Sequence, residues 1–118
     1  MKSNALKDKS FGFAVRIVKI SRFLIKKNEF IISKQLVRSG TSVGAMVREA
    51  EHAESKVDFI HKLAVAQKEC NETLFWLELL KETDLIGNEM FISANNDATE
   101  LMKLLTSIIK TTKNNLIN

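Results

Sequence analysis

Residues 36–85 read LVRSGTSVGAMVREAEHAESKVDFIHKLAVAQKECNETLFWLELLKETDL, and this stretch decides the fold. In its first part, apolar and small residues recur at intervals of three and four, the spacing of one face of a helix. We predict a helix over about 32–53. Its core line consists of Leu36, Gly40, Val43, Val47 and Ala50.

The middle of the stretch predicts a corner. Ser55 and Asp58 have the spacing of a capping box, in which a hydroxyl caps a new helix and an acid lies in its first turn. The chain therefore turns between Ala53 and Ser55. A third helix, over about 56–83, follows the corner.

Two more helices flank this stretch, over about 9–27 and 90–113. Their apolar residues again recur at helical spacing. Between the third and fourth helices, Gly87 is suited to a positive φ angle. The predicted core lines are Phe13, Ile17, Ile20 and Leu24 in the first helix, and Phe91, Ala94, Ala98, Leu101, Leu105, Ile108 and Ile109 in the last.

The composition agrees with an all-α protein. The 118 residues include no proline and only four glycines, and helix-forming residues are frequent. We predict a single domain, residues 1–118, folded as an up-down-up-down antiparallel four-helix bundle. No apolar run reaches the roughly 18 residues of a membrane span. With one cysteine, a cytoplasmic location is expected.

The charge is divided unevenly along the chain. Residues 1–48 carry 11 Lys and Arg against the acids Asp8 and Glu29, a net +9, whereas residues 49–118 carry seven Lys against 12 acids, a net −5. This division favours an anionic partner for the first half, or head-to-tail pairing between copies of the chain.

Basic residues form a stripe on each of the first two helices. Such stripes are either solvated faces or surfaces that follow the phosphates of a nucleic acid, with Phe23 as a ring for base stacking. The candidate nucleic-acid-binding residues are Arg16, Lys19, Arg22 and Lys26 on the first helix, and Lys34, Arg38 and Arg48 on the second.

Gly40 and Gly44 lie one turn apart within the second helix. Glycine inside a helix costs about 0.5–1 kcal/mol relative to alanine, so the pair requires an offsetting gain. We predict close approach of a neighbouring helix backbone. The alternative is backbone contact with a ligand.

The third helix has more apolar surface than one core can cover. The segment LFWLELL, residues 74–80, is apolar almost all round. A helix of this kind must be covered on several sides, and another subunit is the expected cover. The predicted subunit interface contains Val65, Glu69, Trp76 and Leu79.

Two acid–histidine pairs raise the question of a metal site, Glu49 with His52 and Asp58 with His61. Ferritin-like sites also need an acid from each of the other two helices, and the first helix has none beyond Asp8. Arg48 and His52 could attend a phosphate in a nuclease, but no second acid–base partner is specified. We therefore expect no metal, no cofactor and no catalysis.

The second and third helices resemble the bacterial four helix bundle protein family, whose members include proteins encoded in intervening sequences of 23S rRNA genes. The family pattern reads R-S-x-S-I-G-A-N-I-x-E-A, followed by D-F, K-L-x-I-A, K-E, E-T and W-L. Val43, Met46, Val47 and Val65 depart from it. The matching residues are Arg38, Ser39, Ser42, Gly44, Ala45, Glu49, Ala50, Asp58, Phe59, Lys62, Leu63, Ala66, Lys68, Glu69, Glu72, Thr73, Trp76 and Leu77.

This resemblance implies a four-helix bundle assembled as a homopentameric ring. Basic relatives include accessory proteins of diversity-generating retroelements, which bind nucleic acid and a reverse transcriptase. The family brings no catalytic residues. Two functions therefore stay open for this chain: an assembly that binds RNA or DNA non-specifically through the basic helices, or a protein-docking scaffold that binds no nucleic acid.

Overall fold

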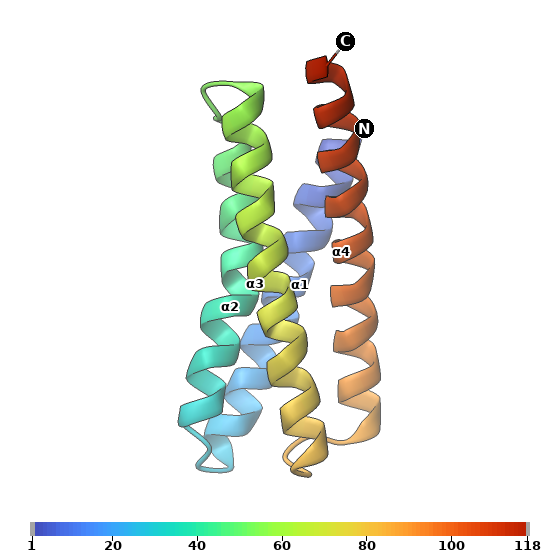
Figure 1. Ribbon diagram of the computed structural model, residues 1–118. Coiled ribbons are helices and arrows are strands. Elements are labelled where there is room, and N and C mark those ends of the chain that lie inside the picture. Colours follow the sequence, from blue (N-terminus) through green and yellow to red (C-terminus); the bar gives the residue numbers. More distant parts are fainter. Residues whose placement is uncertain (1, 118) are drawn as a thin grey trace.

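Four long helices make up most of the chain. The computed structural model describes residues 2–117, and Figure 1 shows the helices running side by side. They are α1 (Lys2–Lys26), α2 (Ile31–Ala50), α3 (Lys56–Glu82) and α4 (Asn88–Ile117). No strand occurs in this described part of the chain, so the predicted all-α class is confirmed.

Consecutive helices pack as antiparallel neighbours. α1 also contacts α4, which closes the bundle, while α1 and α3 lie at opposite corners (Figure 1). The molecule measures 51 × 21 × 20 Å. Within residues 2–117, no helix has the length and apolar character to cross a membrane.

The core is built from the predicted stripe of each helix. α1 contributes Phe13, Ile17 and Leu24, all of which are buried, and α3 contributes Leu63 and Leu77. A buried polar contact joins α2 and α3: the Thr73 hydroxyl donates to Ser39 Oγ at 2.8 Å. Since both hydroxyls are satisfied, burying them costs little.

The bounds of three helices differ from the prediction by two residues or more. α1 begins at Lys2 instead of Lys9, because the buried residues Leu6 and Ser10 extend its stripe by two turns. α2 ends at Ala50 instead of Ala53, since Ser55 adopts an extended backbone (φ −157°) to cap α3. α4 spans 88–117 instead of 90–113.

Local hydrogen bonds fix the three connections. The predicted cap is present, with the Asp58 amide donating to Ser55 Oγ at 3.0 Å. The prediction for Gly87 is wrong: the positive φ angles belong to Asn28 (64°) and Asp84 (61°). These residues directly follow the final turns of α1 and α3, where left-handed backbone ends a helix and Asn or Asp tolerates it.

The two glycines of α2 face α1. A Cβ atom on Gly40 would lie 2.6 Å from Ile17 Cγ2, and one on Gly44 would lie 3.3 Å from the Ser10 carbonyl oxygen. Real Cβ atoms do not come as close as the first distance. The glycines therefore let α1 and α2 approach each other, and helix packing accounts for both.

Candidate nucleic-acid interface

The outward side of α1 carries a line of cations. Burial of Phe13, Ile17 and Leu24 fixes the rotation of the helix, so that Lys19, Arg22 and Lys26 are exposed. Among the described side chains these three make no ion pair. The line spans about 10 Å along the axis at 1.5 Å per residue.

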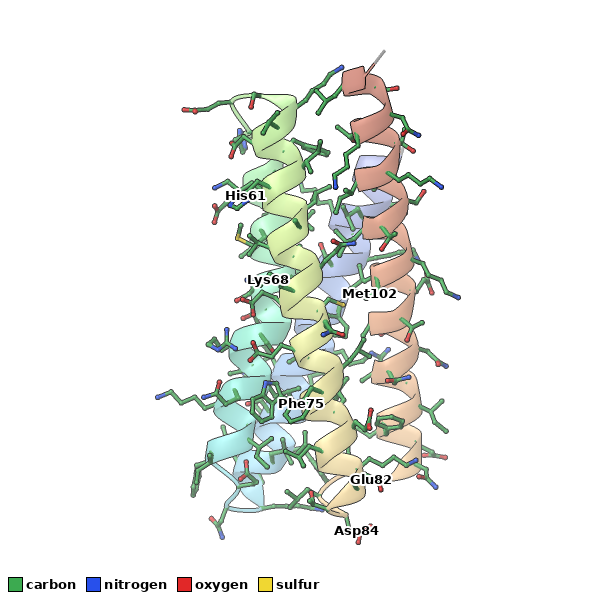
Figure 2. All side chains as sticks on the ribbon, viewed as in Figure 1. His61, Lys68, Phe75, Glu82, Asp84 and Met102 are labelled. Carbon is green, nitrogen blue, oxygen red and sulfur yellow. The ribbon has the colours of Figure 1, made fainter. Side chains whose placement is uncertain are left out.

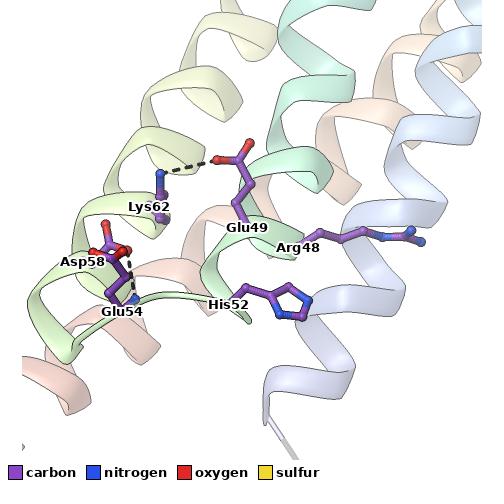
Figure 3. Close-up of a pocket in the computed structure, with 6 residues that line it drawn as sticks. All are labelled: Arg48, Glu49, His52, Glu54, Asp58 and Lys62. Carbon is purple, nitrogen blue, oxygen red and sulfur yellow. Dashed lines mark hydrogen bonds and ion pairs between the residues drawn. The ribbon is translucent and has the colours of Figure 1, made fainter.

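α2 brings two more cations to the same side of the bundle. The Ser21 hydroxyl donates to the Ser33 carbonyl oxygen at 3.4 Å, so the next residues along, Arg22 and Lys34, lie near each other. Arg48, further along α2, points toward α1 (Figure 3). We name these five residues the α1–α2 basic surface: Lys19, Arg22, Lys26, Lys34 and Arg48.

Acids are missing from the helical segments that carry this surface. Neither residues 9–28 nor residues 30–48 contain an Asp or Glu. Glu29, between them, accepts a hydrogen bond from the Ser33 amide at 2.9 Å and is held at the start of α2. The positive potential of the surface is therefore not cancelled by acids within these two segments.

Arg16 lies apart from the other cations, on the side of α1 that faces α4. Its guanidinium donates to Asp97 Oδ2 at 2.7 Å and to Ser93 Oγ at 2.6 Å. Lys9, two turns before Arg16 on α1, pairs with Glu100 of α4. The sequence placed Arg16 with Lys19 and Arg22, but its charge is compensated across the α1–α4 contact.

Arg38 is likewise compensated, on the other side of α2. Its guanidinium pairs with Glu69 at 3.1 Å and with Glu72, while the Trp76 indole N–H donates to Glu72 at 2.9 Å. The hydrogen bonds that Trp76 and Arg38 donate to Glu72 lower the pKa of Glu72, and the bond that Arg38 donates to Glu72 raises the pKa of Arg38. Arg38 therefore fastens α2 to α3.

The predicted subunit interface forms a half-buried stripe on α3, beside α2. Val65, Trp76 and Leu79 are each partly covered by this chain, and Glu69 is held by Arg38. The sequence analysis overlooked Phe75, which is 57% exposed and packs edge-on against Trp76 with ring centroids 4.9 Å apart. Figure 2 shows Phe75 on the outer side of α3, in line with His61 and Lys68.

The aromatic ring beside the basic surface is not the predicted one. Phe23 packs against the core and has the Lys27 ammonium 4.4 Å from its ring centroid, so it does not offer an open face. Phe11 instead is 56% exposed, with Arg48 Cζ 5.5 Å from its ring centroid. The sequence signal for this exposed ring is its spacing. Phe11 lies four residues before Val15, on a side of α1 outside the buried stripe.

A groove runs beside this ring between α1 and α2. Its volume is about 220 Å³, and its wall is formed mainly by small side chains. Close approach of the two helices at Gly44 keeps it shallow. The residues that line it are Lys7, Ser10, Phe11, Ala14, Thr41, Gly44, Ala45 and Arg48.

A second, polar pocket lies at the α2–α3 corner (Figure 3). Two of its three carboxylates are engaged: Glu49 pairs with Lys62 at 3.4 Å, and Asp58 accepts from the Glu54 amide at 3.2 Å. Across the described residues no three metal-binding side chains converge. His52, just after the end of α2, lines this pocket, and its ring lies on the Arg48 side, away from Glu54 and Asp58 (Figure 3).

Cys70 lies in the core, away from both pockets. Its thiol donates to the Ala98 carbonyl oxygen at 3.4 Å, and burial raises its pKa to about 12. Because a thiol with this pKa stays protonated at neutral pH, it is a poor nucleophile.

Comparison with known proteins gives the chain a family. A solved structure of a protein with unknown function, from the S23 ribosomal protein family of Bacteroides thetaiotaomicron VPI-5482, superposes with a TM-score of 0.92. The two sequences are 58% identical over 93% of this chain and 99% of that one. A comparison with curated proteins gave no match. The profile of the 23S rRNA-intervening sequence protein family matches residues 2–107, and the chain therefore belongs to that family.

Proposed function

We propose that this protein is a non-catalytic, oligomeric bundle that binds the sugar-phosphate backbone of RNA or DNA on its α1–α2 basic surface. The observation that carries the proposal is the absence of acids from residues 9–28 and 30–48, beside exposed and unpaired cations. Phosphate contacts supply most of the affinity of non-specific binding. Few amide side chains accompany these cations, so little base-specific reading is expected.

The proposed site differs from the sequence prediction in two residues. Arg16 and Arg38 already have acidic partners within the chain, so a phosphate would have to displace Asp97, or Glu69 and Glu72. The proposal therefore assigns the binding to Lys19, Arg22, Lys26, Lys34 and Arg48 alone.

We also propose that copies of the chain assemble into a closed ring of five. The half-buried apolar stripe of α3 with the exposed Phe75 supports an intermolecular contact, and so does the uneven charge. In a ring, each weak basic surface is repeated around one axis. Simultaneous contacts then raise the affinity for a long nucleic acid.

The test is reversal of three charges on α1, Lys19→Glu, Arg22→Glu and Lys26→Glu together. Binding of labelled RNA and DNA should weaken for all sequences alike, and the slope of log affinity against log salt should become shallower by about 2, at 0.7 per phosphate on single strands. Titrations at low and physiological salt measure both.

A matched control reverses three exposed lysines of α4, Lys103→Glu, Lys110→Glu and Lys113→Glu. It makes the same change of net charge away from the basic surface. Equal loss of binding in both triple variants would show that overall charge alone matters, which would contradict a defined surface.

The second candidate function is a protein-docking scaffold, with a reverse transcriptase as one possible kind of partner. Phe11, Val15 and Ile25 favour it, since they are exposed apolar residues along α1 on the side toward α2. If the wild-type protein binds neither RNA nor DNA even at low salt, this function replaces the first.

A further inference from the structure

The Phe11 ring continues the direction of the basic surface. Residues 11, 15, 22 and 26 are spaced by four, seven and four, so they share one side of α1. About 22 Å separates Phe11 from Lys26 along the helix axis at 1.5 Å per residue. A strand that follows the cations of α1 would therefore pass over this ring.

Arg48 contacts the Phe11 ring from the α2 side. With Cζ 5.5 Å from the centroid, the guanidinium lies within the range of a cation–π contact. More than half of the Phe11 surface remains exposed, so the other side of the ring is open. Within the described side chains the Arg48 N–H groups have no carboxylate partner, which leaves them available to a phosphate.

The groove beside the ring suits a flat group. Ala14, Gly44 and Ala45 in its wall are too small to fill it, and Thr41 and Ser10 add hydroxyl oxygens. Past Phe11 the positive character ends: Asp8 lies one turn earlier on α1, and Glu51 pairs with Lys7 at 3.7 Å. A bound strand is expected to leave the surface there.

From this geometry we infer that Phe11 and Arg48 form a base-stacking site. Single-stranded nucleic acid is then the preferred ligand of the basic surface. One base lies on the open face of Phe11, and Arg48 contacts the adjoining phosphate. The inference rests on the proposed function. It adds a preference for unpaired bases, because the bases of a duplex are stacked on one another and cannot cover the ring.

The test compares Phe11→Ala with Ile92→Ala, a control at an apolar side chain of similar exposure (56% and 54%) on α4. Three labelled probes of about 12 units are used: an oligothymidylate strand, the same strand without bases, and a duplex. Phe11→Ala should weaken binding of the intact strand by roughly 5- to 150-fold. Binding of the abasic strand and the duplex should not change, and Ile92→Ala should leave all three unaffected.

Two further variants separate stacking from apolar contact. Phe11→Trp should keep the affinity for the intact strand, whereas Phe11→Leu, which is apolar but has no ring, should lose it. Leucine that binds as well as phenylalanine would overturn the inference, as would equal losses for duplex and single strand. A change of oligomeric state in Phe11→Ala would also overturn it, since the ring would then pack against a second copy or another protein surface.

Failure of the inference differs from failure of the proposed function. If Phe11→Ala binds like wild type while the triple charge reversal on α1 does not bind, the base-stacking site is contradicted and the proposed function stands. If wild-type protein binds none of the three probes at low salt, both ideas fall.

Discussion

Gly40 is where a single side chain would separate α1 from α2. The hydrogen atom at this position leaves room for Ile17, which is fully buried. Gly12, in the middle of α1, has no atom within 4 Å of the place a Cβ would occupy. The two glycines thus have the same intrinsic cost in a helix, but only Gly40 has a packing gain to offset it.

Gly40→Ala is expected to lower the free energy of unfolding by about 1–2 kcal/mol, since overpacking against Ile17 outweighs the better helix propensity. Gly12→Ala should raise it by about 0.5–1 kcal/mol. Urea denaturation followed by far-UV circular dichroism measures both. In an Ile17→Ala background the penalty of Gly40→Ala should disappear; an undiminished penalty would place its cause elsewhere.

Single residues were predictable from the sequence where the rule is local. The capping of α3 by Ser55 depends on residues three apart, and the packing role of Gly40 follows from its place on a core stripe. The partners of Arg16 and Arg38 were not predictable, because Asp97 and Glu69 lie 81 and 31 residues away. Phe11 was not singled out because its position outside the buried stripe marks it as exposed but does not distinguish a binding residue from an ordinary surface residue.

A set of polar contacts supports the pairing of α2 with α3 beside the apolar core. It contains the Arg38 pairs with Glu69 and Glu72, and the bond between Thr73 and Ser39. All five belong to the sequence pattern by which the family is recognised. The pattern therefore describes how two helices are held in register, in addition to any surface for a ligand.

Acidification should break this network at Glu72. Its pKa lies below the ordinary 4.5, chiefly because Trp76 and Arg38 donate hydrogen bonds to the carboxylate. The stability that it contributes is therefore present above about pH 4.5 and is lost as pH falls through the lowered pKa. As Trp76 is the only tryptophan, its fluorescence should change in this acid range.

Two variants check the assignment. Glu72→Gln should abolish the acid-range change in tryptophan emission, whereas Glu69→Gln, which leaves the indole bond intact, should keep it. Circular dichroism in parallel shows whether the helices persist. An unchanged acid response in Glu72→Gln would mean that another carboxylate controls Trp76.

Element positions followed from the sequence better than element ends did. The four stripes place each helix, and short connections force neighbours to be antiparallel. The ends of α1 and α4 extend beyond the prediction, because tertiary packing of Leu6 lengthens α1 while propensity alone gave no reason to begin there. α3 was the hardest to orient, since it is apolar on several sides.

On the scale of the whole molecule, opposite charges are separated at one end of the bundle. At the end formed by residues 27–30 and 83–87, the exposed cations Lys26 and Lys34 belong to α1 and α2. Glu82 is the last residue of α3, and Asp84 follows it (Figure 2). The sequence indicated this separation but not its direction, which depends on which helices share an edge. Surfaces of opposite charge on different sides favour head-to-tail contacts between copies.

The proposed ring predicts a mass of five times the 13.4 kDa chain in light scattering at micromolar concentration. Rings need one face of each copy to meet a different face of the next, and the α3 stripe with Val65 and Leu79 is the apolar part of such a contact. Val65→Lys with Leu79→Lys should therefore shift the protein toward monomer while its helical content persists, because neither residue is fully buried in the chain.

Val57→Lys is the matched control, since Val57 lies on the same helix and is already 65% exposed. It should leave the mass unchanged, as should the triple charge reversal on α1 if the basic surface faces away from the subunit contacts. A wild-type protein that is only monomeric would remove the ring. A ring that survives the α3 double variant but dissociates on charge reversal would instead place the basic surface within the contact, where it could not bind a nucleic acid.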